Sequence, residues 1–304
     1  DINGAAINNL TDPSKFAGFV KDALELGDMS AVREDFKLVR VGPFVSGISW
    51  TSSDERYLKP VNGTAVVTQP TADEGDQTIT LTAHIKYQNF TDTKEFQVTV
   101  KSLAPAEYSF EGDLTSLNAV APAGTVTGNR LDNTGGAVSY VEGVKGSAVN
   151  LDGTSGVRLP NNLISTNSYT ISLWLKPTQF TDYTTAFFGG ANGNYWLSLV
   201  PSMAGTAKTR VWANGPSFYD NAELANRIPA GQWSHVVIMV DGENNNTIKL
   251  YVNGALQLES PDFRRVMTVA GETNEFALGV NYWDTPFNGA IDELKVFTGT
   301  ISAE

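Results

Sequence analysis

The sequence predicts an all-β protein built from two β-sandwich domains, with one short helix near the N-terminus. Three observations support this prediction. Short apolar stretches with a period of two recur along the chain, turns rich in Gly, Asn and Asp separate them, and the composition is that of folded domains, with 41% hydrophobic and 18% charged residues. A length of 304 residues suits two domains better than one small sandwich.

An amphipathic helix is predicted first. Thr11 or Asp12 can cap it, Pro13 suits its first turn, and apolar residues follow at three- and four-residue spacing from Phe16 to Leu24. From Phe36 onward the period changes to two, which is typical of strands in a small antiparallel sandwich. The clearest of these strands are predicted over residues 48–51, 65–68, 79–83 and 96–100.

A linker is predicted around Pro105, because a proline among small residues separates two strand patterns there. We therefore divide the chain into domains 1–104 and 105–304. The second domain reads as strand and turn throughout, which predicts a two-sheet jelly-roll β-sandwich. Its clearest strands cover residues 171–175, 195–200, 236–240, 248–252 and 276–280, and Asn253-Gly254 predicts a hairpin turn because both residues tolerate positive φ.

The first domain carries a Trp-Thr-Ser-Ser strand at Trp50 and a closing Phe-x-Val-x-Val strand at Phe96. With these motifs, residues 31–100 resemble the atrophied bacterial immunoglobulin-like domains. The resemblance implies a small spacer sandwich of the kind found beside glycosidase or lectin modules.

The second domain carries ordered motifs from Tyr108 to Ile301: YSFEGD, SYTISLWLKP, GQWSHVVIMVDG, KLYVNG and FNGAIDELKVF. In this order they are similar to the concanavalin A-like, laminin-G-like (pentraxin-like) lectin superfamily. The Asn-Tyr-Trp-Asp-Thr-Pro-Phe segment resembles versions attached to secreted bacterial glycan-degrading enzymes. The resemblance implies a non-catalytic, carbohydrate-binding accessory module.

The charge and the chain ends set further expectations. A formal charge of −12 and a pI near 4.6 argue against nucleic acid as a partner. No apolar run approaches the roughly 20 residues of a membrane span. Because the chain begins at Asp1 and stops at Glu304, we expect a piece of a longer secreted or cell-surface bacterial protein that also contains a catalytic domain.

Catalysis by this piece is not expected. Glycosidases need two placed carboxylates, and the Glu-x-Asp-x-x-Glu strand of catalytic members of the superfamily does not occur here. Asp292 and Glu293 are adjacent, so on a regular strand they face opposite sides of the sheet. His84 and His235 both lie in predicted strands and lack a serine elbow nearby, so neither reads as a catalytic base.

A structural calcium ion (Ca²⁺) is a possible cofactor. The superfamily frequently carries one that joins its first and last strands, and Glu111 and Asp292 match the acidic positions there. Two carboxylates fall short of the six to eight oxygens that calcium prefers. The alternative, which the sequence leaves open, is that both are surface carboxylates or cap the backbone.

Sugar binding needs exposed aromatic rings beside polar side chains, because sugars present apolar C–H faces together with hydroxyl groups. Trp50, Trp174 and Trp233 lie within strand patterns and are expected to be buried. Three other segments place aromatics at turns, and they give the candidate carbohydrate-binding residues: Tyr195, Trp196, Trp212, Phe218, Tyr219, Tyr282, Trp283 and Asp284.

The leading hypothesis is that the chain is a carbohydrate-binding pair of modules that holds a secreted glycoside hydrolase on a polysaccharide or host glycan. The alternative is a structural or adhesive accessory role, in which the sandwich packs on a catalytic domain or contacts proteins at the cell surface. Fold alone does not decide between these functions.

Overall fold

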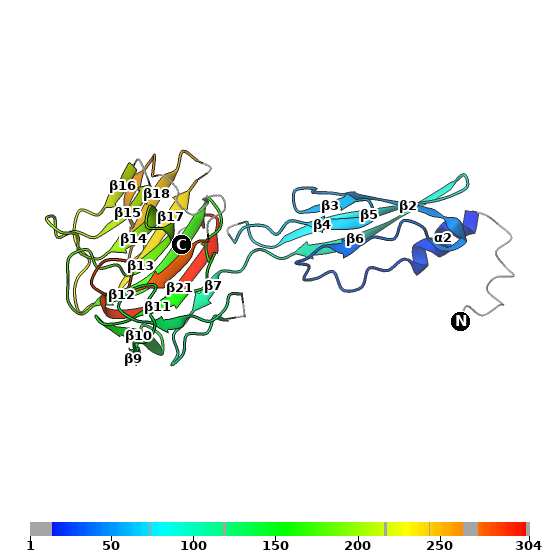
Figure 1. Cartoon of the computed structure of the whole chain (residues 1–304). Coiled ribbons are helices and arrows are strands. Elements are labelled where there is room, and N and C mark those ends of the chain that lie inside the picture. The colour runs from blue at the N-terminus through cyan, green and yellow to red at the C-terminus, as the bar shows by residue number, and fades with distance from the viewer. Residues whose placement is uncertain are drawn as a thin grey trace. The chain divides into compact units, whose positions relative to one another are not determined.

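The computed structural model describes residues 14–72, 74–117, 120–215, 218–242, 244–263 and 273–301. The chain divides into two compact units, Asp1–Leu103 and Ala104–Glu304, and the division lies one residue before the predicted boundary (Figure 1). Strands dominate both units, as predicted, and α2 (Ser14–Ala23) is the α-helix of the described residues. No helix in these ranges has the length and apolarity that crossing a membrane requires.

The first unit consists of helix α2, the short 3-10 helix η1 (Pro43–Val45) and two three-stranded sheets with the orders β1-β4-β3 and β2-β5-β6. Ala17 and Val20 of α2 and Leu24, which follows the helix directly, pack on Ile48 and Ile85 of the second sheet, which explains the helical spacing seen in the sequence. The predicted cap, Thr11 or Asp12, and the predicted first-turn residue Pro13 lie outside the described residues. The strands are β1 (Phe36–Lys37), β2 (Gly47–Ser52), β3 (Leu58–Val61), β4 (Thr64–Val67), β5 (Gln77–Tyr87) and β6 (Phe90–Val100).

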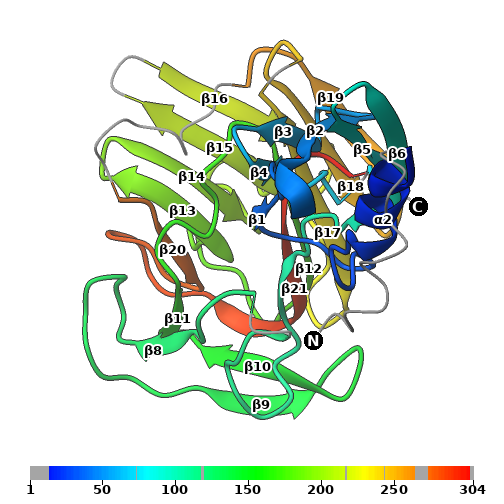
Figure 2. The same ribbon diagram turned by 90° about the vertical axis from the view of Figure 1, so that its right-hand side faces the viewer.

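The second unit is a sandwich of two antiparallel sheets (Figure 2). We call the first sheet C; its order is β19-β18-β17-β12-β21-β10-β9, with β7 also paired to β21. Its strands are β7 (Ala106–Tyr108), β9 (Ser139–Glu142), β10 (Ser147–Asp152), β12 (Tyr169–Pro177), β17 (Ser234–Asp241), β18 (Thr247–Val252), β19 (Ala255–Ser260) and β21 (Asn288–Thr298).

The opposing sheet, sheet D, has the order β16-β15-β14-β13-β20-β11-β8. It supplies the layer on which the candidate site lies. Its strands are β8 (Thr125–Thr127), β11 (Gly156–Leu159), β13 (Phe187–Asn192), β14 (Tyr195–Val200), β15 (Arg210–Gly215), β16 (Phe218–Glu223) and β20 (Glu275–Leu278).

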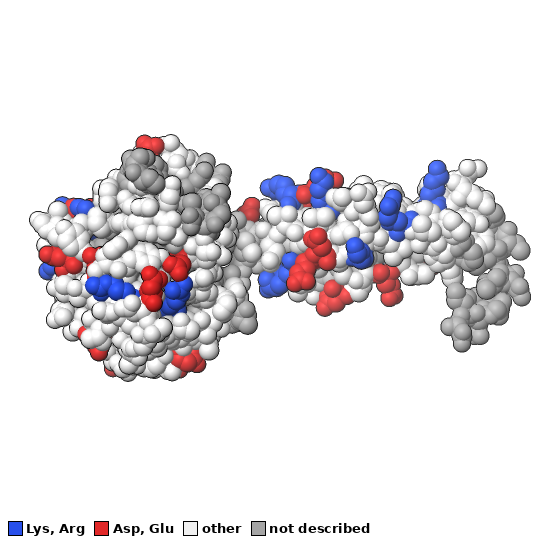
Figure 3. All heavy atoms as spheres, viewed as in Figure 1, with Lys and Arg blue, Asp and Glu red and all other residues white. Residues whose placement is uncertain are grey.

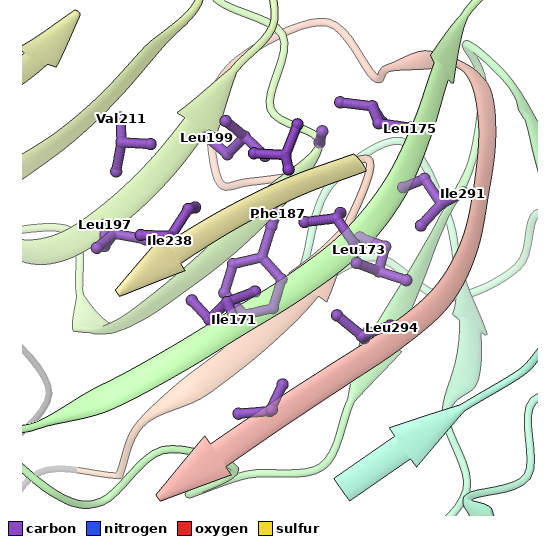
Figure 4. Packing of buried hydrophobic residues seen from close by; sticks show 14 of the residues in the cluster. Ile171, Leu173, Leu175, Phe187, Leu197, Leu199, Val211, Ile238, Ile291 and Leu294 are labelled. Atoms are coloured by element: carbon purple, nitrogen blue, oxygen red, sulfur yellow. The ribbon is translucent and has the colours of Figure 1, made fainter. Parts of the chain in front are cut away.

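The core of the second unit lies between the two sheets, where alternate residues of facing strands interlock (Figure 4). Ile171 and Leu173 of β12 meet Phe187 of β13 and Leu197 of β14, and all four are fully buried. Burying each such side chain contributes about 1.5–3 kcal/mol to folding. Because neighbouring residues of a strand point to opposite faces, this core also fixes which side chains sheet D presents on its outer face.

The predicted hairpin at Asn253-Gly254 is confirmed. The two residues join β18 to β19 and have φ values of 50° and 79°, which is the backbone conformation that this residue pair tolerates. On the face shown in Figure 3, acidic and basic side chains of both units are interspersed and form no basic stripe.

Candidate functional site

A pocket of about 370 Å³ lies on the outer face of sheet D. Leu197, Leu199 and Val211 point inward to the core, so the alternate residues of β14 and β15 point outward. Those outward residues line the pocket together with the β13–β14 turn, β16, the loop before β13 and the loop after β20. The lining residues are Tyr183, Gly193, Trp196, Ser198, Trp212, Asn214, Tyr219, Asn281, Trp283 and Asp284.

Five aromatic rings surround this pocket. Trp196 forms its floor and is only 6% exposed, and the ring centroids of Trp212 and Trp283 lie 5.1 Å and 5.6 Å from that of Trp196. Tyr183 stacks on Trp212 at 6.4 Å with an interplanar angle of 21°. Tyr219 and Trp283 are 62% and 46% exposed. The pocket therefore combines a fixed aromatic floor with open aromatic walls, which is what the apolar face of a sugar ring requires.

Gly190 allows Trp196 to occupy the floor. A Cβ atom at Gly190 would lie 2.4 Å from the Tyr195 carbonyl oxygen and 2.7 Å from the Trp196 Cα, so any side chain here would displace the neighbouring strand. The register between β13 and β14 shifts between Gly190 and Asn192, at the start of the turn. Trp196 also packs on Phe188, with ring centroids 6.2 Å apart, in a small second core beneath the pocket.

A short turn after β20 holds the main polar group. The Asn281 side chain is buried, and its Oδ1 accepts backbone N–H bonds from Trp283 (2.9 Å) and Asp284 (2.7 Å). Its Nδ2 donates to the Asp284 carboxylate at 2.7 Å. This turn fixes the Trp283 ring and the Asp284 carboxylate beside each other. Such a side chain-to-backbone turn is a typical use of asparagine.

Two further polar side chains lie on the strands themselves. The Asn214 amide donates to the Asn194 carbonyl at 3.2 Å, which ties β15 to the β13–β14 turn. The Ser198 hydroxyl donates to the Thr185 hydroxyl at 2.8 Å and is almost fully buried. Both residues keep oxygen lone pairs that can accept a hydrogen bond from a ligand hydroxyl.

The structure brings together five of the eight predicted carbohydrate-binding residues in this pocket, namely Trp196, Trp212, Tyr219, Trp283 and Asp284. Tyr195 does not line it, because its side chain alternates with Trp196 and packs against the main core. Phe218 begins β16, but its side chain lies outside what the structure describes.

Tyr282 also does not line the pocket. Its ring meets Phe188 edge-on at 5.5 Å, and its hydroxyl donates to Glu275. Burial and the Glu275 carboxylate together raise the pKa of Tyr282 well above its usual value. Tyr282 therefore supports the loop that carries Trp283, since the two rings are in contact at 5.3 Å.

Sequence reasoning missed Tyr183, Gly193, Ser198, Asn214 and Asn281 as pocket residues. Ser198 and Asn214 could have been found from strand alternation, because they share a face with Trp196 and Trp212. Tyr183 could not, because it comes from a separate loop and carries no local signal. The prediction that Trp50, Trp174 and Trp233 are buried is wrong, because all three are half-buried: Trp50 lies on β2, Trp174 on the outer face of β12, and Trp233 directly before β17.

Neither histidine belongs to the pocket. His235 stacks on Trp174 on the outer face of sheet C, with ring centroids 5.0 Å apart, and its Nε2 is 2.8 Å from the Ser172 hydroxyl. Burial lowers the pKa of His235. His84 lies in β5 of the first unit, with its Nε2 2.8 Å from the Thr51 hydroxyl. In both cases the hydroxyl belongs to a side chain on the adjacent strand of the same sheet.

Glu111 and Asp292, the predicted calcium ligands, converge on the loop at residues 143–147. Asp292 Oδ2 accepts backbone N–H bonds from Val144 (2.7 Å) and Lys145 (3.2 Å). Glu111 Oε2 accepts one from Ser147 at 2.9 Å. Asp292 is fully buried, and this burial is the main cause that raises its pKa, with the nearby Glu111 carboxylate adding to it.

The 143–147 loop explains why Asp292 is buried. Asp292 pairs with the outward-facing Trp174, so its side chain lies on the outer face of sheet C, where the backbone of this loop covers it. A β-bulge follows directly, because the register of β12 against β21 shifts between Ser172 and Trp174 and Glu293 has a φ of 45°. The simple alternation expected for Asp292 and Glu293 therefore does not apply at this point of the strand.

Glu111 and Asp292 supply only part of the oxygen ligands that a calcium ion needs. Asp292 Oδ1 also accepts the Glu293 N–H at 2.8 Å, so three of the four oxygens of the Glu111–Asp292 pair are bonded to backbone donors. Among the described residues, no three His, Cys, Asp or Glu side chains are grouped as metal ligands. The geometry directly supports a carboxylate clamp on the loop, and a calcium ion would depend on carbonyl oxygens for most of its ligands.

Comparison with known proteins agrees with this architecture. Residues 151–304 match the family model of the concanavalin A-like lectin/glucanases superfamily, and residues 19–103 match that of the atrophied bacterial Ig domain. Both assignments agree with the resemblances seen in the sequence. No curated protein sequence matched the chain.

Among solved structures, the chain is similar to domain 4 of AbnA, a GH43 extracellular arabinanase from Geobacillus stearothermophilus, in complex with arabinotriose. The identity is 41% and the TM-score 0.61, over 66% of this chain and 96% of that one. The CBM40 of the Ruminococcus gnavus IT-sialidase, bound to sialyllactose, is 20% identical over 45% of this chain and 79% of that one. Its TM-score of 0.38 is too low to support a functional argument. The chain belongs to the concanavalin A-like lectin/glucanases superfamily.

Proposed function

We propose that the second unit is a non-catalytic carbohydrate-binding module, and that the pocket on sheet D holds the glycan. The single observation that carries this proposal is the set of exposed rings, Tyr219 and Trp283, above the Trp196 floor and beside the Asp284 carboxylate. Aromatic faces desolvate the C–H surface of a sugar, and fixed polar groups select its hydroxyls.

The composition of the pocket supports a binding role over a catalytic one. Asp284 is the one carboxylate among the described residues that line it, whereas glycoside hydrolysis uses two carboxyl groups on either side of the scissile bond. The proposed parent protein is a secreted bacterial glycoside hydrolase, and its catalytic domain would be a separate part of the same chain. Binding would then raise the concentration of that domain at the polysaccharide.

The arabinotriose complex of domain 4 of AbnA, which is 41% identical to this chain, supports arabinotriose as the first ligand to test. Isothermal titration calorimetry of the whole chain with arabinotriose, followed by an array of neutral and acidic glycans, would measure affinity and breadth. We expect weak binding of at least one glycan, with a Kd in the micromolar to millimolar range, as is usual for a small open site.

Matched variants connect that binding to the pocket. Trp283→Ala should weaken binding about tenfold, since a stacked aromatic ring at a binding site contributes on the order of 1–2 kcal/mol. Tyr251→Ala is the control, because this tyrosine lies on β18 of sheet C, next to buried Leu250. Retention of no glycan at all would reject the binding module and favour the structural or adhesive alternative.

A further inference from the structure

We propose that the pocket selects neutral glycans and rejects those that carry a carboxylate at the bound ring, and that Asp284 is the residue that imposes this selection. The inference rests on the proposed carbohydrate-binding function and deepens it by naming the class of sugar. Two features support it: the charge of the pocket and the hydrogen-bonding groups of its lining.

The charge of the pocket is negative. Asp284 lies in the lining, and no Lys or Arg is among the described residues that line it. Arg210 shares the outer face of β15 with Trp212, but its guanidinium is engaged by Glu223, with the Nε at 2.9 Å, and by the Asn221 side chain at 3.3 Å. An anionic sugar would therefore meet a carboxylate without a free cation to pair with.

The hydrogen-bonding groups of the lining suit neutral hydroxyl groups. The Ser198 and Asn214 side chains donate to Thr185 and to the Asn194 carbonyl and keep oxygen acceptors, whereas the Asn281 Oδ1 already accepts two backbone N–H bonds. The Trp212 Nε1 has no hydrogen-bond partner in the part of the chain that the structure describes. A sugar hydroxyl can donate to such acceptors and accept from such a donor, whereas a carboxylate on the ligand can only accept.

Asp284 is held in place for this role. The Asn281 Nδ2 donates to one carboxylate oxygen at 2.7 Å, and the Asp284 N–H donates back to the Asn281 Oδ1 at 2.7 Å. A carboxylate held at a fixed position can accept from a ligand hydroxyl without first losing rotational freedom. The same rigidity prevents it from turning away from a ligand charge.

The expected discrimination follows from Coulomb's law. Two like unit charges about 4 Å apart repel by an amount that corresponds to roughly a fivefold loss of affinity in bulk water. At the lower effective dielectric of a protein surface the loss is larger. The overall charge of −12 acts in the same direction over longer distances, but salt screens that part beyond about 8 Å at physiological ionic strength.

The test compares arabinotriose with arabinotriose whose terminal primary alcohol has been oxidised to a carboxylate, using the whole chain at roughly physiological salt. The wild-type protein should bind the neutral probe at least about fivefold more tightly. The array serves as a second measurement, in which neutral glycans should be retained and their uronic or sialylated counterparts should not.

Asp284→Asn removes the charge, keeps an oxygen acceptor and should reduce the ratio of the two Kd values to below about twofold. Glu259→Gln is the control, because it removes one negative charge from β19 of sheet C, where Glu259 faces Lys249 at 3.5 Å. This control should leave the ratio unchanged. Thermal melting of both variants shows that each is folded.

The outcomes are distinguishable. Equal Kd values for the two probes in the wild-type protein would overturn the charge selection while leaving carbohydrate binding in place. A large ratio that Asp284→Asn does not reduce would also overturn it, because the selection would come from another group. Failure to bind either probe or any glycan on the array would reject the proposed function itself.

Discussion

At the scale of single residues, the tryptophans of the pocket divide into one that belongs to the fold and one that faces the ligand. Trp196 is nearly buried and packs on Phe188, whereas Trp283 is about half exposed. Trp196→Ala should lower the free energy of unfolding by about 3–5 kcal/mol through the cavity it leaves. Trp283→Ala should change it by about 0.5 kcal/mol or less, as for other exposed sites. Urea unfolding of both variants measures the difference, and equal losses would contradict the assignment.

Tyr183 gives a second residue-level prediction. Its φ of 65° is rarely adopted by a bulky residue and costs about 1–2 kcal/mol, yet the position brings its ring onto Trp212. Tyr183→Ala and Tyr183→Gly both remove the ring and should weaken glycan binding to the same extent, about threefold to tenfold. Only the glycine variant also relieves the backbone cost, so its melting temperature should exceed that of the alanine variant. Different binding losses in the two would indicate that backbone strain, not the ring, matters for affinity.

The candidate residues show what sequence can predict at this scale. Trp212 and Tyr219 were found because aromatics in a polar, turn-rich segment are unusual, and strand pairing then brings them together, with ring centroids 6.0 Å apart. Tyr195 and Tyr282 carry the same local signal but face other directions. Which side of the sheet a residue takes depends on the register, and the register is decided by the whole core.

At the scale of elements, strand β21 carries Asp292, one of the two carboxylates that bind the backbone of the 143–147 loop. Asp292 lies beside the bulge of this strand on the outer face of sheet C, and the loop at residues 143–147 covers Asp292 and Glu111 through backbone N–H bonds. The sequence indicated that Glu111 and Asp292 belong together through the family resemblance. The bulge itself could not be predicted, because it arises from pairing with β12, far away in sequence.

Gly146 makes this clamp testable. A Cβ atom there would lie 2.2 Å from both Glu111 carboxylate oxygens, and its φ is 59°. Gly205 has a φ of 78° and open space around it, so it serves as a matched control for the backbone cost alone. Gly205→Ala should cost about 1 kcal/mol and Gly146→Ala clearly more, about 3 kcal/mol. Thermal unfolding compares them, and similar losses would argue against a tight clamp.

Calcium remains a prediction for the same element. If a calcium ion completes the Glu111–Asp292 pair, removing it with EDTA should lower the melting temperature, and adding calcium back should restore it. Glu111→Gln should abolish the difference, because calcium prefers charged carboxylate oxygens. Magnesium at the same concentration controls for ionic strength. A melting temperature that does not respond to EDTA or calcium would leave the backbone clamp as the role of both carboxylates.

At the scale of the whole molecule, the two units have separate cores. The apolar clusters of residues 1–103 share no member with those of residues 104–304. The division and both fold types were predictable, because the change from helical to strand periodicity and the break near Pro105 are local signals. The assembly of the pocket was not, since its lining comes from segments distant in sequence.

Separate cores lead to a prediction about truncation. Residues 104–304 expressed alone should fold cooperatively and bind arabinotriose with a Kd within about twofold of that of the whole chain, because the described pocket residues all lie in this unit. Circular dichroism and calorimetry test both parts. A tenfold loss of affinity in the shorter protein would mean that the first unit contributes to the site.

The aromatic floor and walls have an optical consequence. Three of the chain's six tryptophans line the pocket, with ring centroids of neighbouring indoles 5.1 Å and 5.6 Å apart. Indoles this close exchange excitation energy, so half of the protein's tryptophans report on the place where a ligand would sit. A sugar that displaces water from Trp283 would change the emission of the whole group, so the unlabelled protein would report its own occupancy.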